Sequence, residues 1–91
     1  MADASEVKYV TLDEIIRLQA DSNYTKVHLT QNRVFVSAKT LKEYDEILKE
    51  QHFLRIHKSH LINPTHIESY DKQGWLKMSD GSEVEVARRK K

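Results

Sequence analysis

The sequence predicts a single, mostly β domain of short, mainly antiparallel strands with one covering α-helix. Two observations carry this prediction. Several segments alternate apolar and polar residues with the period of two that buries one face of a strand. Only one segment, at about residues 40–50, combines the helical period with a start signal. At 91 residues the chain has room for one domain, and no internal repeat or Pro/Gly-rich linker marks a boundary.

Strands and tight turns account for the first half of the chain. The strand candidates are residues 7–10, 24–30 and 33–38. The clearest is 24–30, because Thr25, Val27 and Leu29 alternate with polar residues along it. Asp21-Ser22-Asn23 precede it with residue types that favour turns, and Gln31-Asn32 connect it to the next strand as a β-hairpin.

Residues 40–50 predict the helix. Thr40 and Glu43 form a capping box, in which each residue's side chain satisfies a backbone donor of the other. Behind this start one helical face is apolar, comprising Leu41, Tyr44, Ile47 and Leu48. We expect this helix to cover one side of a sheet, and it is too acidic to enter a DNA groove.

Beyond the helix the pattern returns to strands. The candidates are residues 53–56, 61–62, 67–70, 75–79 and 83–87. Asn63-Pro64 interrupts the chain, because proline lacks an N–H group and restricts the preceding residue. Asp80-Gly81 predicts a hairpin turn between the last two strands. The whole chain then has seven or eight short strands and a basic end.

The composition excludes several classes of protein. With only two glycines, the chain contains neither a dinucleotide-binding glycine fingerprint nor a phosphate loop. It has no cysteine, which excludes a disulfide framework, cysteine-ligated zinc and a thiol nucleophile. No apolar run reaches the length of a signal-peptide core or a membrane span. We therefore expect a soluble, cytoplasmic domain.

Charge is distributed unevenly, although the formal net charge is only +1. Residues 1–50 hold seven Lys/Arg and nine Asp/Glu, a balance of −2, whereas residues 51–91 hold eight and five, a balance of +3. The second half also holds four of the five histidines. This asymmetry favours an anionic partner for the C-terminal half, with a solvated surface of mixed charge as the alternative.

The sequence offers no enzyme active site. It has no nucleophile elbow, no zinc-protease helix motif and no paired carboxylates in apolar surroundings. His57 and His60 have the spacing H-x2-H, but no nearby carboxylate or cysteine completes a metal site. We therefore expect no catalytic activity, no metal and no cofactor.

One stretch, residues 53–67, carries a distinctive set of positions: Phe53, Arg55, His57, Lys58, Ser59, Asn63 and Ile67. This set resembles the signature of the LytTR DNA-binding domain of bacterial LytR/AlgR-type response regulators. The similarity continues through residues 9–15, 20–24, 40–41 and 80–89, and so covers about residues 7–89. It departs from the family pattern at Ala87, where members commonly carry serine.

The resemblance implies an elongated, LytTR-like fold that binds double-stranded DNA sequence-specifically, with loops in the major groove. It implies the output domain of a two-component response regulator, which serves a phosphorelay and regulates transcription. Residues 7–91 would form this domain after a disordered or linker-like segment at 1–6. No receiver domain precedes it and the C-terminal helix of relatives is missing, which suggests an excised fragment. The isolated domain would be a monomer, and the full regulator a homodimer on short, repeated sites.

The resemblance also implies three contact segments, carried over by motif position. Base edges would be contacted by Asn23, Lys58 and Arg89, because asparagine can bond adenine and basic side chains can bond guanine. The DNA backbone would be contacted by Tyr24, Lys26, His57, Ser59, His60, Arg88 and Lys90. Three signature residues are interpreted as structural: Arg55, Asn63 and Ile67.

Each contact residue also has a structural interpretation. Asn23 would be only a turn former, Tyr24 an aromatic at the edge of the core, Lys58 and His60 solvated loop residues, and 88–91 a frayed tail. Two other functions compete. Single-stranded nucleic acid would need exposed aromatics, and most of the seven aromatic residues have core positions. A protein-interaction or ligand-sensing β module would not bind duplex DNA at any salt concentration.

Overall fold

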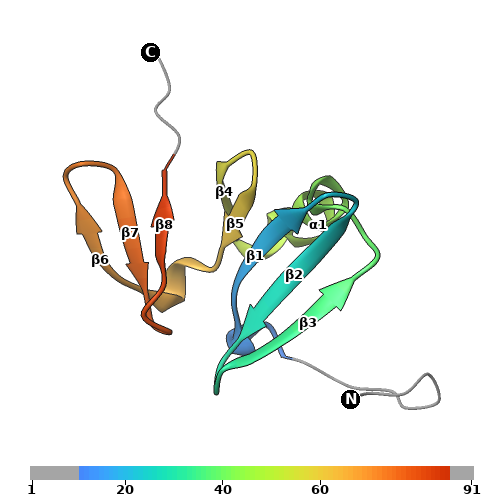
Figure 1. Cartoon of the computed structure of the whole chain (residues 1–91), viewed down its shortest axis with the longest axis horizontal. Coiled ribbons are helices and arrows are strands. Elements are labelled where there is room, and N and C mark those ends of the chain that lie inside the picture. The colour runs from blue at the N-terminus through green and yellow to red at the C-terminus, as the bar shows by residue number, and fades with distance from the viewer. Residues whose placement is uncertain (1–10, 87–91) are drawn as a thin grey trace.

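A computed structural model describes residues 11–86 as two antiparallel sheets and one α-helix (Figure 1). The strands are β1 (Ile15–Asp21), β2 (Tyr24–Leu29), β3 (Arg33–Ser37), β4 (Leu54–His57), β5 (His60–Ile62), β6 (Ile67–Asp71), β7 (Trp75–Met78) and β8 (Glu83–Glu85). Helix α1 spans Leu41–Leu48, and 3-10 turns lie at Leu12–Glu14, Lys49–Gln51 and Pro64–His66. The mostly β fold with one helix is confirmed. The segment 1–6 and the strand candidate 7–10 lie outside the described residues.

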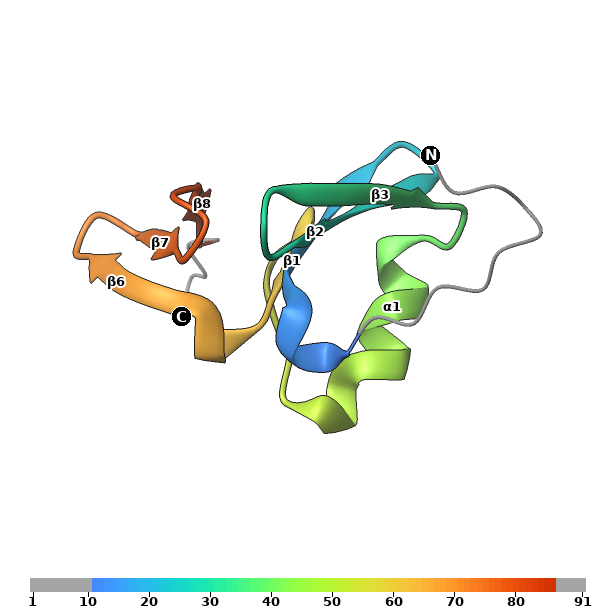
Figure 2. The ribbon, with the colours of Figure 1, turned by 90° about the horizontal axis from the view of Figure 1, so that it is seen from below.

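The strands form a five-stranded sheet in the order β3-β2-β1-β5-β4 and a three-stranded sheet in the order β6-β7-β8. Helix α1 lies on one side of the five-stranded sheet, and the three-stranded sheet lies beyond β1 on the other side (Figure 2). This succession of layers runs along the long axis of a molecule that measures 46 × 24 × 24 Å. The elongated shape is therefore confirmed.

Two apolar clusters hold these layers together. The cluster between the five-stranded sheet and the helix contains Leu18, Val27, Leu29, Leu41, Leu48, Phe53 and Leu61. The cluster between the two sheets contains Ile16, Ile62, Leu76, Met78 and Val84. Neighbouring residues Leu61 and Ile62 belong to different clusters, so the centre of the five-stranded sheet is buried on both faces.

The β2–β3 hairpin follows the sequence closely. Thr25, Val27 and Leu29 are buried, as their alternation predicts. Leu29 pairs with Arg33, so the turn contains three residues rather than the expected two, and its last two, Gln31 and Asn32, have left-handed φ angles of 65° and 59°. Strand β3 forms one edge of the sheet and lies largely in solvent.

Helix α1 begins at the predicted Thr40 cap, but only half of the capping box forms, because the Glu43 carboxylate accepts from the Thr40 hydroxyl over 3.3 Å instead of from the Thr40 backbone N–H. The Glu43 backbone N–H donates to Oγ1 of Thr40 over 3.3 Å, and Leu41 and Leu48 are buried against the sheet. The assignment of Ile47 to the buried face is wrong, because its side chain is 55% exposed. One turn of helix spans about 3.6 residues, so Ile47 lies about 100° around the axis from Leu48, outside the narrow stripe that meets the sheet.

Asn63 joins the two sheets, in agreement with its structural interpretation. Its side chain is buried and donates from Nδ2 to the carbonyl oxygens of Leu12 and Ile15 over 3.2 and 2.9 Å. Its Oδ1 accepts from the backbone N–H and the hydroxyl of Thr65 over 3.2 and 2.9 Å. These bonds cap the 3-10 turn Pro64–His66 and fix where the chain leaves the first sheet for the second.

Candidate nucleic-acid interface

The β4–β5 hairpin carries the middle group of predicted contacts. His57 and His60 pair across it, and Lys58 and Ser59 form its two-residue turn. The interpretation of His60 as a solvated loop residue is wrong, since His60, like His57, belongs to a strand. The tight turn nevertheless brings their rings to a centroid distance of 5.2 Å.

Hydrogen bonding defines the donor that His57 can offer. The backbone N–H of Ser59 donates to Nδ1 of His57 over 3.0 Å. A ring nitrogen that accepts a hydrogen bond carries no proton, so the neutral His57 ring has its N–H at Nε2. This N–H is a suitable donor for a phosphate oxygen.

Arg55 fixes the conformation of the same turn. Its guanidinium donates from Nε to the carbonyl oxygen of His57 over 3.2 Å and from Nη2 to that of Lys58 over 2.7 Å. Its Nη1 lies 3.1 Å from Oδ2 of Asp45 on α1. Arg55 therefore ties the turn that presents Lys58 to the helix behind the sheet, which agrees with its structural interpretation.

The β1–β2 hairpin carries the first group of predicted contacts. Its turn consists of Ser22, with a φ of 59°, and the exposed Asn23. Tyr24 is 52% exposed, and Nζ of Lys26 lies 3.7 Å from Oδ2 of Asp21. This ion pair is exposed on both sides and so constrains Lys26 only weakly.

A backbone hydrogen bond brings the two hairpins together. The Ala20 N–H donates to the carbonyl oxygen of Ser59 over 2.9 Å, and the tips of the two hairpins lie at the same end of the molecule (Figure 1). The third predicted group, Arg88, Arg89 and Lys90, lies outside the described residues, as does Ala87. Strand β8 runs toward that same end of the molecule (Figure 1).

Strand register aligns several polar residues behind these tips. Lys26 pairs with Gln19, Gln19 with His60, and His60 with His57, which makes one row across four strands. Gln19 was not among the predicted contacts. Oε1 of Gln19 lies 3.1 Å from Nε2 of His28, which pairs with Arg17 two rows away. A polar residue between Leu18 and Ala20 was the only signal in the sequence that pointed to it.

Two histidines on this face are electrically neutral at pH 7. Burial, followed by the nearby charge of Arg17, lowers the pKa of His28 to about 4. Burial, followed by the charges of His57 and Arg17, also lowers the pKa of His60. Nδ1 of His60 is buried and has no hydrogen-bond partner within the described residues. Positive charge at this end therefore comes from lysine and arginine.

Lys58 is the available cation of the β4–β5 turn. It is exposed and, within residues 11–86, forms no ion pair. The connection between β6 and β7, which contains Lys72, lies at the same upper edge in Figure 1 as the hairpin tips, but at the far left along the long axis. Lys72 is a further candidate contact that the motif comparison could not identify, because it lies outside the signature.

The expectation that most aromatic residues lie in the core is wrong. Four of the seven are at least 41% exposed: Tyr24, Phe35, Tyr70 and Trp75. All four lie on edge strands or beside turns, where one-sided packing leaves rings in solvent. They are scattered over both sheets rather than interleaved with basic residues, so they do not form the stacking platform that single-stranded nucleic acid requires.

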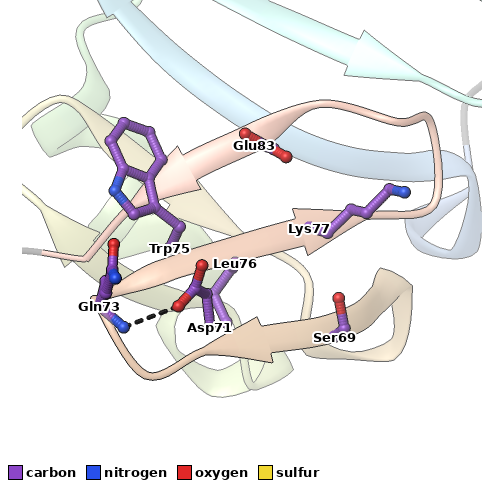
Figure 3. Close-up of a pocket in the computed structure, with 7 residues that line it drawn as sticks. All are labelled: Ser69, Asp71, Gln73, Trp75, Leu76, Lys77 and Glu83. Atoms are coloured by element: carbon purple, nitrogen blue, oxygen red, sulfur yellow. Dashed lines mark hydrogen bonds between the residues drawn. The ribbon is translucent and has the colours of Figure 1, made fainter.

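Other kinds of site are weakly supported in the part of the chain that the structure describes. No group of three or more His, Cys, Asp or Glu side chains within residues 11–86 could hold a metal ion. No helix there is long and apolar enough to cross a membrane. A shallow cavity of about 330 Å³ lies on the three-stranded sheet (Figure 3).

Comparison with known proteins gives one consistent family. Residues 5–91 match the family model of the LytTr DNA-binding domain. The sensory transduction protein LytR of Staphylococcus saprophyticus is 29% identical over 65 residues, which cover 71% of this chain and 25% of that protein. The chain thus spans about a quarter of the length of this relative.

A solved structure has the same fold. It is the LytTr DNA-binding domain of a putative methyl-accepting/DNA response regulator from Bacillus cereus. The two structures superpose with a TM-score of 0.79 at 24% sequence identity, and the match covers 94% of this chain and 82% of that one. The elongated arrangement of antiparallel strands is therefore shared with a domain of this kind.

Proposed function

The chain belongs to the LytTR family of DNA-binding domains, and from this premise we propose that it reads double-stranded DNA through two hairpin turns in the major groove. The family is one of DNA-binding domains and not of enzymes, which confirms the expectation of no catalytic activity. The proposal concerns which residues bind DNA, and how.

One observation supports the proposal above all others. The hydrogen bond from Ala20 to Ser59 joins two turns that lie 35 residues apart in sequence, at Asn23 and Lys58. Both turns belong to short, register-fixed hairpins, so their side chains are presented from rigid strands. Rigid presentation lowers the entropy that binding must overcome.

The residue types at these turns suit different parts of DNA. The Asn23 amide can pair with adenine and the Lys58 ammonium with guanine, so we assign them to base edges together with Arg89. We assign the DNA backbone to the remaining predicted contacts: Tyr24, Lys26, His57, Ser59, His60, Arg88 and Lys90. Among these, His57 and His60 would act as hydrogen-bonding groups.

The wider role follows the relatives. The curated relative is described as a sensory transduction protein, and the solved structure as part of a response regulator. We propose that this domain is likewise the output part of a cytoplasmic, phosphorelay-controlled transcription regulator. A single module of this kind buries roughly 600–1,000 Å² on DNA, so the isolated domain would bind weakly as a monomer. Two copies on repeated sites would gain affinity through effective concentration.

Selection against a randomised duplex library at low salt, followed by sequencing, tests the proposal directly. The purified chain should enrich a short recurring motif, and Lys58→Ala and Asn23→Ala should each relax one position of it. If Lys58 contacts phosphate instead, the motif should persist while the slope of log K against log salt shrinks by about 0.9. Lys42→Ala, at an exposed lysine on helix α1, is the matched control and should change neither quantity. Failure of the folded chain to retain any duplex would favour a protein-interaction module.

A further inference from the structure

The outer face of the three-stranded sheet presents a tryptophan between two carboxylates. Trp75 on β7 pairs in register with Asp71 on β6 and with Glu85 on β8. The neighbouring residue Leu76 is buried between the sheets, so the alternation of the strand places Trp75 on the opposite, solvent-facing side. The Trp75 side chain is 41% exposed, which is a large apolar surface to leave in water.

A shallow cavity lies against this tryptophan. Its volume is about 330 Å³, and Ser69, Asp71, Gln73, Trp75, Leu76, Lys77 and Glu83 line it (Figure 3). The backbone N–H of Gln73 donates to Oδ1 of Asp71 over 2.8 Å, which holds that carboxylate at the end of the strand. The cavity thus offers an aromatic surface and fixed acceptor oxygens side by side.

The charge of this face selects its partner. It carries the three carboxylates Asp71, Glu83 and Glu85 and one ammonium group, that of Lys77. None of these four groups forms an ion pair within residues 11–86. A surface with this excess of negative charge repels DNA phosphates, so the face is unsuited to the nucleic acid that the hairpin turns would bind.

Tryptophan beside carboxylates suits a guanidinium group in particular. The planar guanidinium stacks on an aromatic face while its N–H groups donate to carboxylate oxygens. An ammonium group is more strongly hydrated and lacks the planar fork, so it satisfies only part of this arrangement. We propose that this face docks an arginine-bearing segment of a partner protein. The proposal rests on the three-stranded sheet and is independent of DNA binding.

The chain provides its own probe for this site. Trp75 is the single tryptophan among the 91 residues, so intrinsic tryptophan fluorescence reports on this face alone. The experiment titrates the purified chain with the peptide acetyl-Gly-Arg-Gly-Arg-Gly-amide at low salt and follows the emission of Trp75. The matched probe replaces both arginines with citrulline, which keeps the planar shape and removes the charge.

The arginine peptide should change the emission with a saturable curve, and the citrulline peptide should bind at least about five-fold more weakly. Asp71→Asn and Glu83→Gln should each weaken the arginine peptide about two- to five-fold, the usual effect of removing one exposed ion pair. Glu50→Gln neutralises an exposed carboxylate in the 3-10 turn after α1 and should leave the curve unchanged.

Three results would overturn the proposal. They are an absence of saturation up to millimolar peptide, equal binding of the citrulline peptide, and wild-type affinity in both neutralised variants. Circular dichroism of each variant verifies that it is folded, which is the expected state because both side chains lie in solvent. Duplex binding by Glu83→Gln should be retained, so loss of the peptide site and loss of the DNA site are separable in the same samples.

Discussion

Asn63 offers the sharpest test of how the two sheets are joined. Its buried amide donates to the carbonyl oxygens of Leu12 and Ile15 and accepts from two groups of Thr65. We compare Asn63→Ala, which removes all four hydrogen bonds, with Asn63→Asp. Aspartate keeps an acceptor for Thr65 but turns a carboxylate oxygen toward the two carbonyl oxygens.

The magnitudes follow from this geometry. At about 1 kcal/mol net for each hydrogen bond, Asn63→Ala should lower the free energy of unfolding by about 2–4 kcal/mol. For a domain of this size that corresponds to a fall in Tm of roughly 10–25 °C. Asn63→Asp should cost more than the alanine variant at pH 7, because it buries an unpaired charge. The difference should shrink as the pH falls and the new carboxyl group takes up a proton.

Urea and thermal unfolding followed by circular dichroism measure both variants. Asn32→Asp is the matched control, since it makes the same chemical change at an exposed turn position whose φ of 59° aspartate tolerates. We expect its effect to stay within about 0.5 kcal/mol, as for other surface changes. A loss below about 1 kcal/mol in Asn63→Ala, or an aspartate variant as stable as the control, would refute the reasoning.

Three further predictions concern a turn, a histidine and a glycine. Arg55→Gln removes the donors that hold the Lys58 turn. If ordering the free turn costs about 1.4 kcal/mol, duplex binding measured by fluorescence anisotropy should weaken about ten-fold. Asp45→Asn should weaken duplex binding less, and equal effects of the two variants would contradict the role assigned to the bonds from Arg55 to the backbone. The pKa of His28 falls from its ordinary 6.5 to about 4 on folding, so the unfolded chain binds more protons between these values and the urea midpoint should drop from pH 7 to pH 5. Because the ring is partly exposed the loss should be only about 1 kcal/mol, and His28→Gln should flatten it. Gly81 has a φ of 86° and no atom within 4 Å of an added Cβ; Gly81→Ala should therefore cost about 1–2 kcal/mol in thermal unfolding, from backbone strain alone.

Local signals predicted the local parts of the fold. The β2–β3 hairpin depends on alternation and on turn residues that are adjacent in sequence, and the start of α1 depends on a cap three residues long. Strand β1 was harder to predict from the sequence. The pairing of β1 with β2 shifts register between Ile15 and Arg17, so Ile16 and Leu18 enter different clusters, and simple alternation does not describe the strand.

The candidate site was predictable only where the family signature or a turn marked it. The signature identified the Lys58 turn, but nothing in the sequence shows that Ala20 would bond Ser59, because contacts between distant segments leave no local pattern. Gln19 lies on the row of predicted contacts only through the pairing of three strands. The exposure of Trp75 likewise depends on a sheet face that no other element covers, which periodicity cannot reveal.

The electrostatics of the hairpin end determine what kind of binding this domain can achieve. Burial keeps His28 and His60 neutral at pH 7, so they add hydrogen bonds but no attraction at a distance. Lys26 forms an ion pair with Asp21, which leaves Lys58 as the principal cation of the two joined turns. The two turns alone therefore attract DNA only weakly over a Debye length of about 8 Å, and under the proposed function their discrimination would depend on short-range contacts. Such turns would favour specificity over affinity, and two copies on one DNA site would supply the affinity that each copy lacks.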